Sequence, residues 1–363
     1  MPIRPSLPLC DAALPGSVSR GSGGVWRPSR KLLETPVSTR ADAAPLLQVE
    51  GVRKYFPAAG SLPWSRARGY VRAVDGISFV VHRDETLSLV GESGCGKTTT
   101  AKLVLRLDEP TAGRIMFRGQ DIKTLRGPAN RRYRAGIQAV FQDPWSSLNP
   151  RMRVRDVIAE PLVVNQRLRR HEVEERVAQL LMAVGLEPAM ASNFPHEFSG
   201  GQRQRIVVAR ALSLNPALIV LDEPVSALDV SIRAQTMNLL KDLQERFGMS
   251  YLLIAHDLAT VRYLSRRVAV MYAGQIVESA PAEKLFAQPM HPYTQALIDA
   301  AAPARPGDGE QRAVVGGEVP SPINPPAGCR FHPRCPFAFD RCSREAPRLV
   351  EHDKGHTVAC HLY

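Results

Sequence analysis

Eight residues constrain this chain more than any others. They match the pattern G-x-x-x-x-G-K-[ST], in which a glycine-rich turn directs successive backbone N–H groups at phosphate groups. They are Gly91, Glu92, Ser93, Gly94, Cys95, Gly96, Lys97 and Thr98. Residues 86–90 before them form an apolar run typical of a buried strand, and residues 97–107 carry apolar side chains at helical spacing. The sequence therefore predicts a phosphate-binding loop between a strand and a helix.

Composition narrows the class of protein without deciding its function. With 363 residues, of which 44% are hydrophobic, the chain can build one large domain or two around packed cores. Its apolar runs are strand-sized, whereas a membrane-spanning helix needs about 20 residues, so a role at a membrane would be that of a peripheral subunit. The net charge of +12 comes mostly from scattered arginines and is compatible with nucleic acid, anionic lipid or nucleotide partners.

The chain divides into three parts by composition. The first 45 residues are rich in Pro, Ser, Gly and Arg and show no periodicity, which predicts disorder; their prolines interrupt any secretory signal. A wrongly chosen start codon would explain this segment equally well. Residues 46–50, 77–81 and 113–117 then have the composition of strands, the last before a polar turn at 119–121. Beyond residue 288 prolines become dense again, but Cys, His and aromatic residues there predict a small ordered appendix.

The middle of the chain has the pattern of an α/β core with a helical insertion. Residues 147–214 contain long amphipathic stretches, such as 171–184, with apolar side chains three and four apart. The core resumes with the unbroken apolar runs 217–221 and 250–255, which are typical of strands buried on both faces of a parallel sheet.

Two acidic residues complete a predicted hydrolytic site. Cleavage of a bound triphosphate needs a phosphate cradle, a divalent cation, an oriented water and a proton acceptor. Lys97 would act on the outer phosphates and the Thr98 hydroxyl would bind magnesium. Asp222, directly after the strand 217–221, is placed to complete the magnesium site, and Glu223 to orient or deprotonate the water. An acidic pair after a strand can also be a simple helix cap.

A second phosphate-binding element is predicted ahead of that strand. Ser199, Gly200, Gly201 and Gln202 come at the start of the helical stretch 202–212. Such a segment exposes a helix N-terminus, whose N–H groups and dipole favour a phosphate. A lone Ser-Gly-Gly is usually only a turn. Here its position between a phosphate loop and an acidic strand end favours the binding role.

Taken in order, these motifs resemble the ATP-binding cassette (ABC) family over about residues 46–279. The resemblance rests on the phosphate loop, the Ser-Gly-Gly signature, the acidic pair, the segment 226–229 and His256. It implies that Gln142 joins the magnesium site to the helical subdomain, that Asp229 lies at a dimer interface, and that His256 contacts the γ-phosphate. Phe198 stands where leucine usually opens the signature; it removes no phosphate-facing group, and we expect no loss of activity.

The resemblance also implies the rest of the nucleotide site. An aromatic residue near the first strand should stack on adenine; spacing from Val52 favours Phe56, with Tyr55 as a competitor. The catalytic residues would be Glu223, His256 and Gln142, and the magnesium ligands Thr98, Gln142 and Asp222. The implied ATP contacts are Gly91, Glu92, Ser93, Gly94, Cys95, Gly96, Lys97, Thr98, Thr99, Phe56, Tyr55, Asp222, Ser199, Gly200, Gly201, Gln202 and Asp229.

The implied fold class is α/β: a P-loop NTPase (RecA-like) core with an antiparallel β subdomain, a helical subdomain insertion at about 147–214, and a small Cys-rich C-terminal extension. The expected divisions are 1–45, 46–285 for the nucleotide-binding domain, and 286–363 for the extension. In this family two cassettes pack head to tail, so that each nucleotide lies between the P-loop of one and the signature of the other. Only one P-loop is present here, so the second cassette should be another chain. Soluble two-cassette proteins of translation or DNA repair therefore fit poorly.

Flanking motifs resemble one branch of the family, the ATPase subunits of oligopeptide and dipeptide importers. They include 141–144, 147–151, 222–231, 291–294, 321–326 and 328–336. The match is closest to the F-type subunit, which pairs with a D-type ATPase. It implies ATP and Mg²⁺ as cofactors, two transmembrane permease subunits, an extracytoplasmic solute-binding protein, no nucleic acid, and a peripheral position on the cytoplasmic face of the plasma (inner) membrane. Nickel or glutathione import remains an alternative, as does a soluble nucleic-acid-associated ATPase, which only the net charge supports.

Four of the six cysteines crowd the C-terminus. Cys329, Cys335, Cys342 and Cys360 have the spacing C-x5-C-x6-C-x17-C, which is not the paired C-x2-C of a zinc ribbon. The subfamily resemblance implies a 4Fe-4S iron-sulfur cluster with a structural role, with Zn²⁺ or unligated thiols as alternatives. Cys95 is interpreted as a small filler between glycines, which bound ATP should protect from alkylation.

Overall fold

The structure is a computed structural model that describes residues 44–58, 69–143, 147–166, 168–226, 228–301, 316–318 and 320–363. The chain separates into two units, residues 1–43 and 44–363, and only the second is described here. The disorder expected for the first 45 residues therefore falls almost wholly outside the described residues. So do Cys10 and Ala227, and with them part of the segment 226–229.

A parallel sheet carries the core because its strands are apolar on both faces. The strand order is β11-β12-β10-β9-β3-β8-β7-β6, and the pairs from β9 to β6 are parallel. Every residue of β3, β7 and β8 is buried, as expected for strands covered on both sides. The parallel strands are β3 (Thr86–Val90), β6 (Ile137–Val140), β7 (Leu218–Asp222), β8 (Ser250–Ile254) and β9 (Arg267–Tyr272).

A smaller antiparallel sheet covers one side of this core. Its order is β2-β1-β4-β5, formed by β1 (Leu47–Pro57), β2 (Tyr70–Val81), β4 (Ala112–Phe117) and β5 (Gln120–Asp121). The polar turn expected at 119–121 thus includes a short strand. One hydrophobic cluster joins residues of this sheet to β3 and to helix α1 (Lys97–Val104), which follows the phosphate loop.

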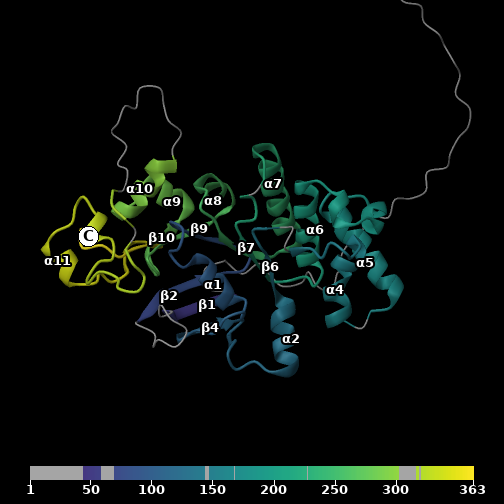
Figure 1. The fold of residues 1–363 in the computed structure, drawn as a ribbon, viewed down its shortest axis with the longest axis horizontal. Helices are drawn as coiled ribbons and strands as arrows, with labels where there is room; N and C mark the ends of the chain where they lie inside the picture. Colours follow the sequence, from purple (N-terminus) through teal and green to yellow (C-terminus); the bar gives the residue numbers. More distant parts are fainter. Residues whose placement is uncertain are drawn as a thin grey trace, which may run out of the picture. The chain divides into compact units, whose positions relative to one another are not determined.

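Helices cover the opposite face. The second hydrophobic cluster joins the other side of the large sheet to α7 (Val230–Phe247), α8 (Leu258–Leu264), α9 (Ala282–Ala287) and α10 (Pro292–Ala301). In Figure 1 these green helices lie above the sheet, and β1, β2 and β4 lie below it. Among the described residues, no helix is both long and apolar enough to cross a membrane.

The predicted helical insertion lies between β6 and β7. Because its apolar side chains recur at helical spacing, they pack into the same cluster as the face of the sheet that carries α7. Figure 1 shows these helices gathered beyond the β6 edge. The segment contains α4 (Val154–Asn165), α5 (Arg170–Ala183), η2 (Pro188–Ser192), η3 (Pro195–Glu197) and α6 (Gly200–Leu212); α2 (Gly127–Gly136) precedes β6.

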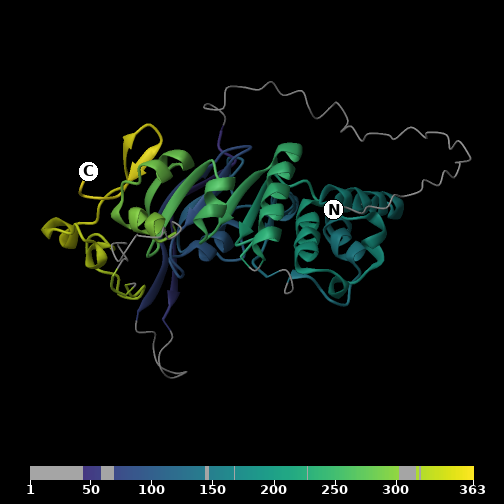
Figure 2. The ribbon, with the colours of Figure 1, turned by 90° about the horizontal axis from the view of Figure 1, so that it is seen from above.

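The C-terminal residues build the other edge of the large sheet. β10 (Gln275–Pro281) pairs with β9 and with β12 (His356–Val358), and β12 pairs with β11 (Val350–Asp353), all antiparallel. Between β10 and β11 lie α9, α10, η4 (His332–Arg334) and α11 (Asp340–Arg344). Figures 1 and 2 show the yellow, last part of this segment, which includes α11, at the end opposite to α4 and α5. The expected appendix therefore continues the core sheet itself, because β12 adds to β10.

Candidate functional site

Glycine is required at two positions of the phosphate loop. Gly91 and Gly96 have φ values of +150° and +109°, a region of backbone conformation that favours glycine. A Cβ on Gly91 would lie 2.1 Å from the Met271 carbonyl oxygen, and one on Gly96 would lie 2.3 Å from that of Ala73. Strands β9 and β2 therefore press against the loop. Their backbones determine its path between β3 and α1.

The Lys97 amine is folded onto its own loop. Nζ donates to the carbonyl oxygens of Gly91, at 2.7 Å, and Glu92, at 3.0 Å. Lys97 is only 6% exposed, whereas Thr98 beside it is exposed at the first turn of α1. A buried amine that donates to neutral carbonyls is stabilised further when an anion replaces them, because hydrogen bonds between charged partners are stronger. The loop can therefore offer this charge to a phosphate.

One pocket brings the separate predicted motifs together. Its volume is about 460 Å³. It is bounded by the phosphate loop on one side and by the ends of β6, β7 and β8 on the other. Because these strands are parallel, their carboxyl ends meet at the same edge of the sheet. The lining residues are Ala73, Ser93, Gly94, Gly96, Lys97, Thr98, Thr99, Gln142, Glu223 and His256.

Glu223 is held between two partners in this pocket. Gln142 Nε2 donates to its Oε2 at 2.9 Å, and His256 Nδ1 lies 3.1 Å from its Oε1. The backbone φ of Glu223 is +49°, and its N–H donates to the carbonyl oxygen of Ile254 on β8. A non-glycine residue in this region of backbone conformation costs of order 1–3 kcal/mol and often marks a functional position. Here it aims the carboxylate away from the sheet and into the pocket.

Asp222 is the last residue of β7 and is 7% exposed. Burial raises the pKa of its carboxyl group, and the neighbouring Glu223 carboxylate raises it further, while Lys97 and Lys102 oppose both effects. A bound cation at this position would stabilise the ionised form of Asp222. The simpler interpretation of the acidic pair as a helix cap does not fit, because α7 begins later, with Asp229 as its N-cap residue.

The signature forms a helix start, as predicted, but outside this pocket. Ser199 is the N-cap of α6; its Oγ accepts from Gln202 N at 3.3 Å, and Gln202 Oε1 accepts from Ser199 N at 3.0 Å. This reciprocal capping box satisfies two helix-end N–H groups. All four residues from Ser199 to Gln202 are described, and none lines the pocket beside Lys97. The chain therefore does not bring its own signature to its own phosphate loop.

The two candidate adenine-stacking residues lie on β1, beside the pocket and outside its lining. The Tyr55 hydroxyl donates to Asp75 Oδ1 at 2.5 Å, and burial raises the pKa of Tyr55. The Lys54 amine lies 4.9 Å from the centre of the Phe56 ring. Tyr55 pairs with Arg72 on β2, next to the lining residue Ala73. Both rings are half-buried, and their contacts do not single out either one as the adenine-stacking ring.

The tail cysteines gather without forming a site for a metal ion. All four are free thiols, and Cys329 N donates to the Cys342 carbonyl oxygen at 2.8 Å. Burial, with a smaller contribution from the nearby Cys360, Cys342 and Cys335, raises the pKa of Cys329 to about 11. Within the described residues, however, no group of three or more His, Cys, Asp or Glu side chains is arranged to hold a metal ion. The expected iron-sulfur or zinc ligand set is therefore not supported by this arrangement.

Sequence reasoning missed the side chains that approach the phosphate loop from the C-terminal segment. The Tyr293 hydroxyl accepts the Glu92 N–H at 2.8 Å, and Arg334 donates to the Glu92 carboxylate. These partners are about 200 and 240 residues apart in the chain. The motif around Tyr293 was visible as a pattern, but no local signal connects it or Arg334 to the loop.

Comparisons with known proteins agree with this geometry. Residues 74–226 match the family described as ABC transporter, and residues 277–342 match the one described as oligopeptide/dipeptide transporter, C-terminal region. The chain is 50% identical to the oligopeptide transport ATP-binding protein AppF of Bacillus subtilis, over 90% of this chain and 99% of that protein. It is 44% identical to the dipeptide transport ATP-binding protein DppF of Haemophilus influenzae, over 87% and 96%.

Solved structures show the same fold over the cassette. The structure of cbiO1 from Clostridium perfringens, part of the ABC transporter complex cbiONQ, superposes with a TM-score of 0.58 at 27% identity, covering 67% of this chain and 91% of that one. The ATP-binding cassette MJ0796, a dimer bound to ADP and Pi in a post-hydrolysis state, gives a TM-score of 0.57 at 27% identity, covering 65% and 98%.

A phosphate loop after β3, with a buried carboxylate at the end of β7 and β8 between them, defines a P-loop nucleoside triphosphatase. The relatives place it within that class. This chain belongs to the ABC transporter family and is an ABC-type ATPase of the oligopeptide/dipeptide transport group.

Proposed function

We propose that this chain hydrolyses ATP in a site shared with a second ATPase chain and thereby drives the import of peptides through a membrane permease. The observation that carries the first part is the pocket of about 460 Å³ that gathers Lys97, Gln142, Glu223 and His256. The same chain keeps its signature elsewhere, at the start of α6. A second cassette is needed to complete the site.

The roles follow from what each group can do. Backbone N–H groups of the phosphate loop and Lys97 would hold the β- and γ-phosphates. When bound, Mg²⁺ neutralises charge that develops on the phosphates; Thr98, Gln142 and Asp222 are the oxygen-bearing side chains fitted to hold it. Glu223 orients a water molecule and takes up its proton, while His256, 3.1 Å from that carboxylate, reaches the γ-phosphate side of the pocket.

The second ATPase chain would place its own signature against the phosphates bound by this chain. The N–H groups at a helix N-terminus, where the signature lies, bind phosphate well. The dimeric relative MJ0796 with ADP and Pi supports this arrangement. A Cβ added to Gly200 would meet no atom of the described residues within 4 Å, which supports access of a ligand from outside the chain to this side of α6. We infer a heterodimer with a D-type ATPase, in which Asp229, at the start of α7, lies near the interface.

The names of the relatives support peptides as the transported solute. We infer a peripheral position on the cytoplasmic face of the membrane, with a permease as the direct partner and a solute-binding protein acting from outside. A pocket of about 520 Å³ lies between residues 147–152, which come shortly after Gln142 in the chain, and helices α4 and α6. A permease seated there would sense movement of the helical segment when ATP closes the dimer.

We also infer that the four tail cysteines hold an iron-sulfur cluster, with Zn²⁺ as the alternative. The support is the subfamily resemblance and the mutual proximity of four unpaired thiols. A four-iron cluster takes thiolates from four cysteines. To bind it, the side chains of the four tail cysteines would have to rearrange. A brown protein that contains iron and sulfide supports the cluster; a colourless one with stoichiometric zinc rules it out.

The function is tested on the assembled transporter. Peptide-loaded binding protein should stimulate ATP hydrolysis, Lys97→Ala should abolish it, and Lys123→Ala, an exposed lysine outside the phosphate pocket, should leave it unchanged. Stimulation by nickel or glutathione in place of peptides would change the solute and keep the role. Hydrolysis that needs nucleic acid and no permease would overturn the proposal.

A further inference from the structure

Two arginines of the C-terminal segment reach the walls of the ATP pocket. Arg330 and Arg334 lie between Cys329 and Cys335, on and beside η4, and each forms a largely shielded ion pair with a residue of the nucleotide-binding core. We propose that they are positioning residues for ATP, through which the C-terminal segment determines the geometry of the phosphate loop and of strand β2. The inference rests on the proposed function, since it takes ATP to be the ligand of the loop.

Arg334 holds the second residue of the phosphate loop. Its Nη1 and Nη2 donate to the two carboxylate oxygens of Glu92 at 2.8 and 2.9 Å, and Nη1 also lies 3.3 Å from the Tyr272 hydroxyl. Such a two-bonded pair restricts orientation as well as distance, because the guanidinium and carboxylate groups must lie in nearly the same plane. The Arg334 side chain is only 6% exposed. Tyr293 holds the same residue from the backbone side by accepting its N–H.

Glu92 connects this contact to the charge that would meet the phosphates. Its carbonyl oxygen accepts from Lys97 Nζ at 3.0 Å, beside the Gly91 carbonyl at 2.7 Å. A shift of Glu92 would therefore move an anchor of the Lys97 amine. Arg334 is not among the residues that line the pocket; it acts through Glu92.

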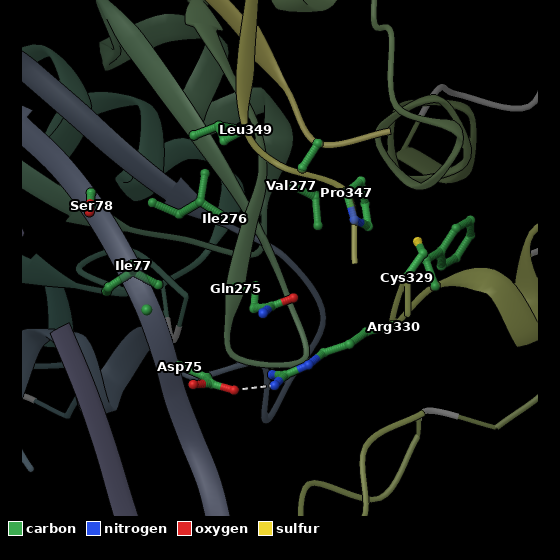
Figure 3. A pocket seen from close by; sticks show the side chains of 13 residues that line it. Asp75, Ile77, Ser78, Gln275, Ile276, Val277, Cys329, Arg330, Pro347 and Leu349 are labelled. Carbon is green, nitrogen blue, oxygen red and sulfur yellow. Dashed lines mark hydrogen bonds and ion pairs between the residues drawn. The ribbon is translucent and has the colours of Figure 1, made fainter. Parts of the chain in front are cut away.

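Arg330 performs the equivalent task on the other wall. It pairs with Asp75 of β2 and donates to the Ala273 carbonyl oxygen in the turn between β9 and β10. Figure 3 shows its side chain extending from the C-terminal segment past Gln275 to the Asp75 carboxylate. The other carboxylate oxygen of Asp75 accepts the Tyr55 hydroxyl at 2.5 Å. Arg330 thereby fixes one of the two candidate adenine-stacking rings.

The β9–β10 turn links the two walls. Gly274 N donates to the Cys95 carbonyl oxygen in the phosphate loop at 2.9 Å, and Asp75 N donates to the Gly274 carbonyl oxygen at 2.8 Å. Arg330 lies against this turn, so the C-terminal segment, β2 and the phosphate loop form one connected network. A buried pair adds little net stability but leaves an uncompensated charge when one partner is removed. Here the ion pairs hold the phosphate loop in a single geometry.

The C-terminal segment also supplies a matched control. Arg341 and Glu345 on and after α11 form an ion pair of similar length, 2.8 Å, but both side chains are 60% exposed. Removing an exposed pair of this kind has little effect. Arg341→Gln therefore changes the same residue type in the same segment without touching the nucleotide core.

The test measures ATP affinity and turnover separately in the assembled transporter. Arg334→Gln should raise the KM and the equilibrium dissociation constant for ATP about tenfold, with kcat within about threefold, and Arg334→Lys, which cannot form both bonds, should fall between Arg334→Gln and the unsubstituted protein. Glu92→Gln should produce the same shift. The Arg334→Gln and Glu92→Gln double variant should be no worse than either single variant, because the two act as one pair. Arg341→Gln should match the unsubstituted protein.

Unchanged ATP affinity in both single variants, or fully additive effects in the double variant, would overturn the inference. If Arg334→Gln does not fold, Glu92→Gln still decides, because it weakens the same pair from the more exposed side, 29% against 6%. Lys97→Ala, measured alongside, separates this inference from the proposed function. If Lys97→Ala still binds ATP, the proposed function is contradicted. If Lys97→Ala loses ATP binding while Arg334→Gln binds ATP normally, only the positioning role is contradicted.

Discussion

Replacement of Glu223 by glutamine tests the proposed chemistry most directly. The substitution conserves shape: an amide oxygen can still accept from Gln142 Nε2, which now lies 2.9 Å from Oε2. It removes the only property that matters for proton transfer, because a neutral amide does not take up a proton from water. It also removes the negative charge that raises the pKa of Asp222, so the neighbouring carboxyl should ionise more readily and Mg²⁺ binding should not suffer.

The expected loss follows from the role of a general base, which contributes about 10²- to 10⁴-fold in rate. At about 1.4 kcal/mol per factor of ten, the barrier should rise by about 3–5 kcal/mol. ATP binding should persist, because Lys97 and the phosphate loop are untouched, and ATP should then hold the two cassettes together as a stable closed dimer.

Single-turnover hydrolysis by the assembled transporter measures the chemical step, and size-exclusion chromatography with ATP detects the dimer. Glu245→Gln, on the exposed side of α7, is the control and should keep full activity. Turnover of Glu223→Gln within about threefold of the unsubstituted protein would remove Glu223 from its role. Loss of ATP binding would show instead that it acts on the nucleotide and not on the water.

Three further predictions concern folding and reactivity. Gly201→Ala should lower the unfolding free energy by about 1–3 kcal/mol, since its Cβ would lie 2.6 Å from Ile232 Cγ2; Gly200→Ala, with open space around it, should keep stability in thermal unfolding and lose transporter ATPase activity. Burial lowers the pKa of His291 to about 4, against about 6.5 unfolded. Between about pH 6.5 and pH 4, therefore, His291 takes up a proton in the unfolded chain but not in the folded one, and the free energy of unfolding falls by up to about 3 kcal/mol. His291→Asn should remove this pH dependence from an acid-unfolding curve. An unchanged curve would contradict the prediction. Because burial raises the pKa of Cys95, its thiol should react slowly with iodoacetamide even without ATP, and rapid labelling in mass spectrometry would refute this.

Much of the site could be predicted because its residues are adjacent in the chain or follow strands. The loop from Gly91 to Thr98 needs only a strand before it and a helix after it, and both are present at β3 and α1. The apolar run that became β7 predicted where the carboxylates of Asp222 and Glu223 would emerge. The association of Gln142 and His256 with Glu223 came from a family resemblance; nothing in local sequence pattern would have joined them.

Other parts could not be predicted locally. Gln120 and Asp121, in the expected polar turn, form a short strand only because β4 lies opposite. The cysteine spacing could exclude a zinc ribbon, yet it could not show whether four thiols converge, and among the described residues they approach one another without a metal-holding arrangement.

Sequence by itself predicted a phosphate-binding loop, the core strands beside it, and the carboxylates that could serve a metal, because each of these depends on neighbours a few residues apart. The family resemblance already implied that the signature lies away from its own phosphate loop. Only the tertiary structure decided that Arg330 and Arg334 reach the nucleotide core from the far end of the chain. Those contacts depend on which strands pair and which edge the C-terminal segment extends. They result from long-range packing, which local periodicity and residue spacing do not predict.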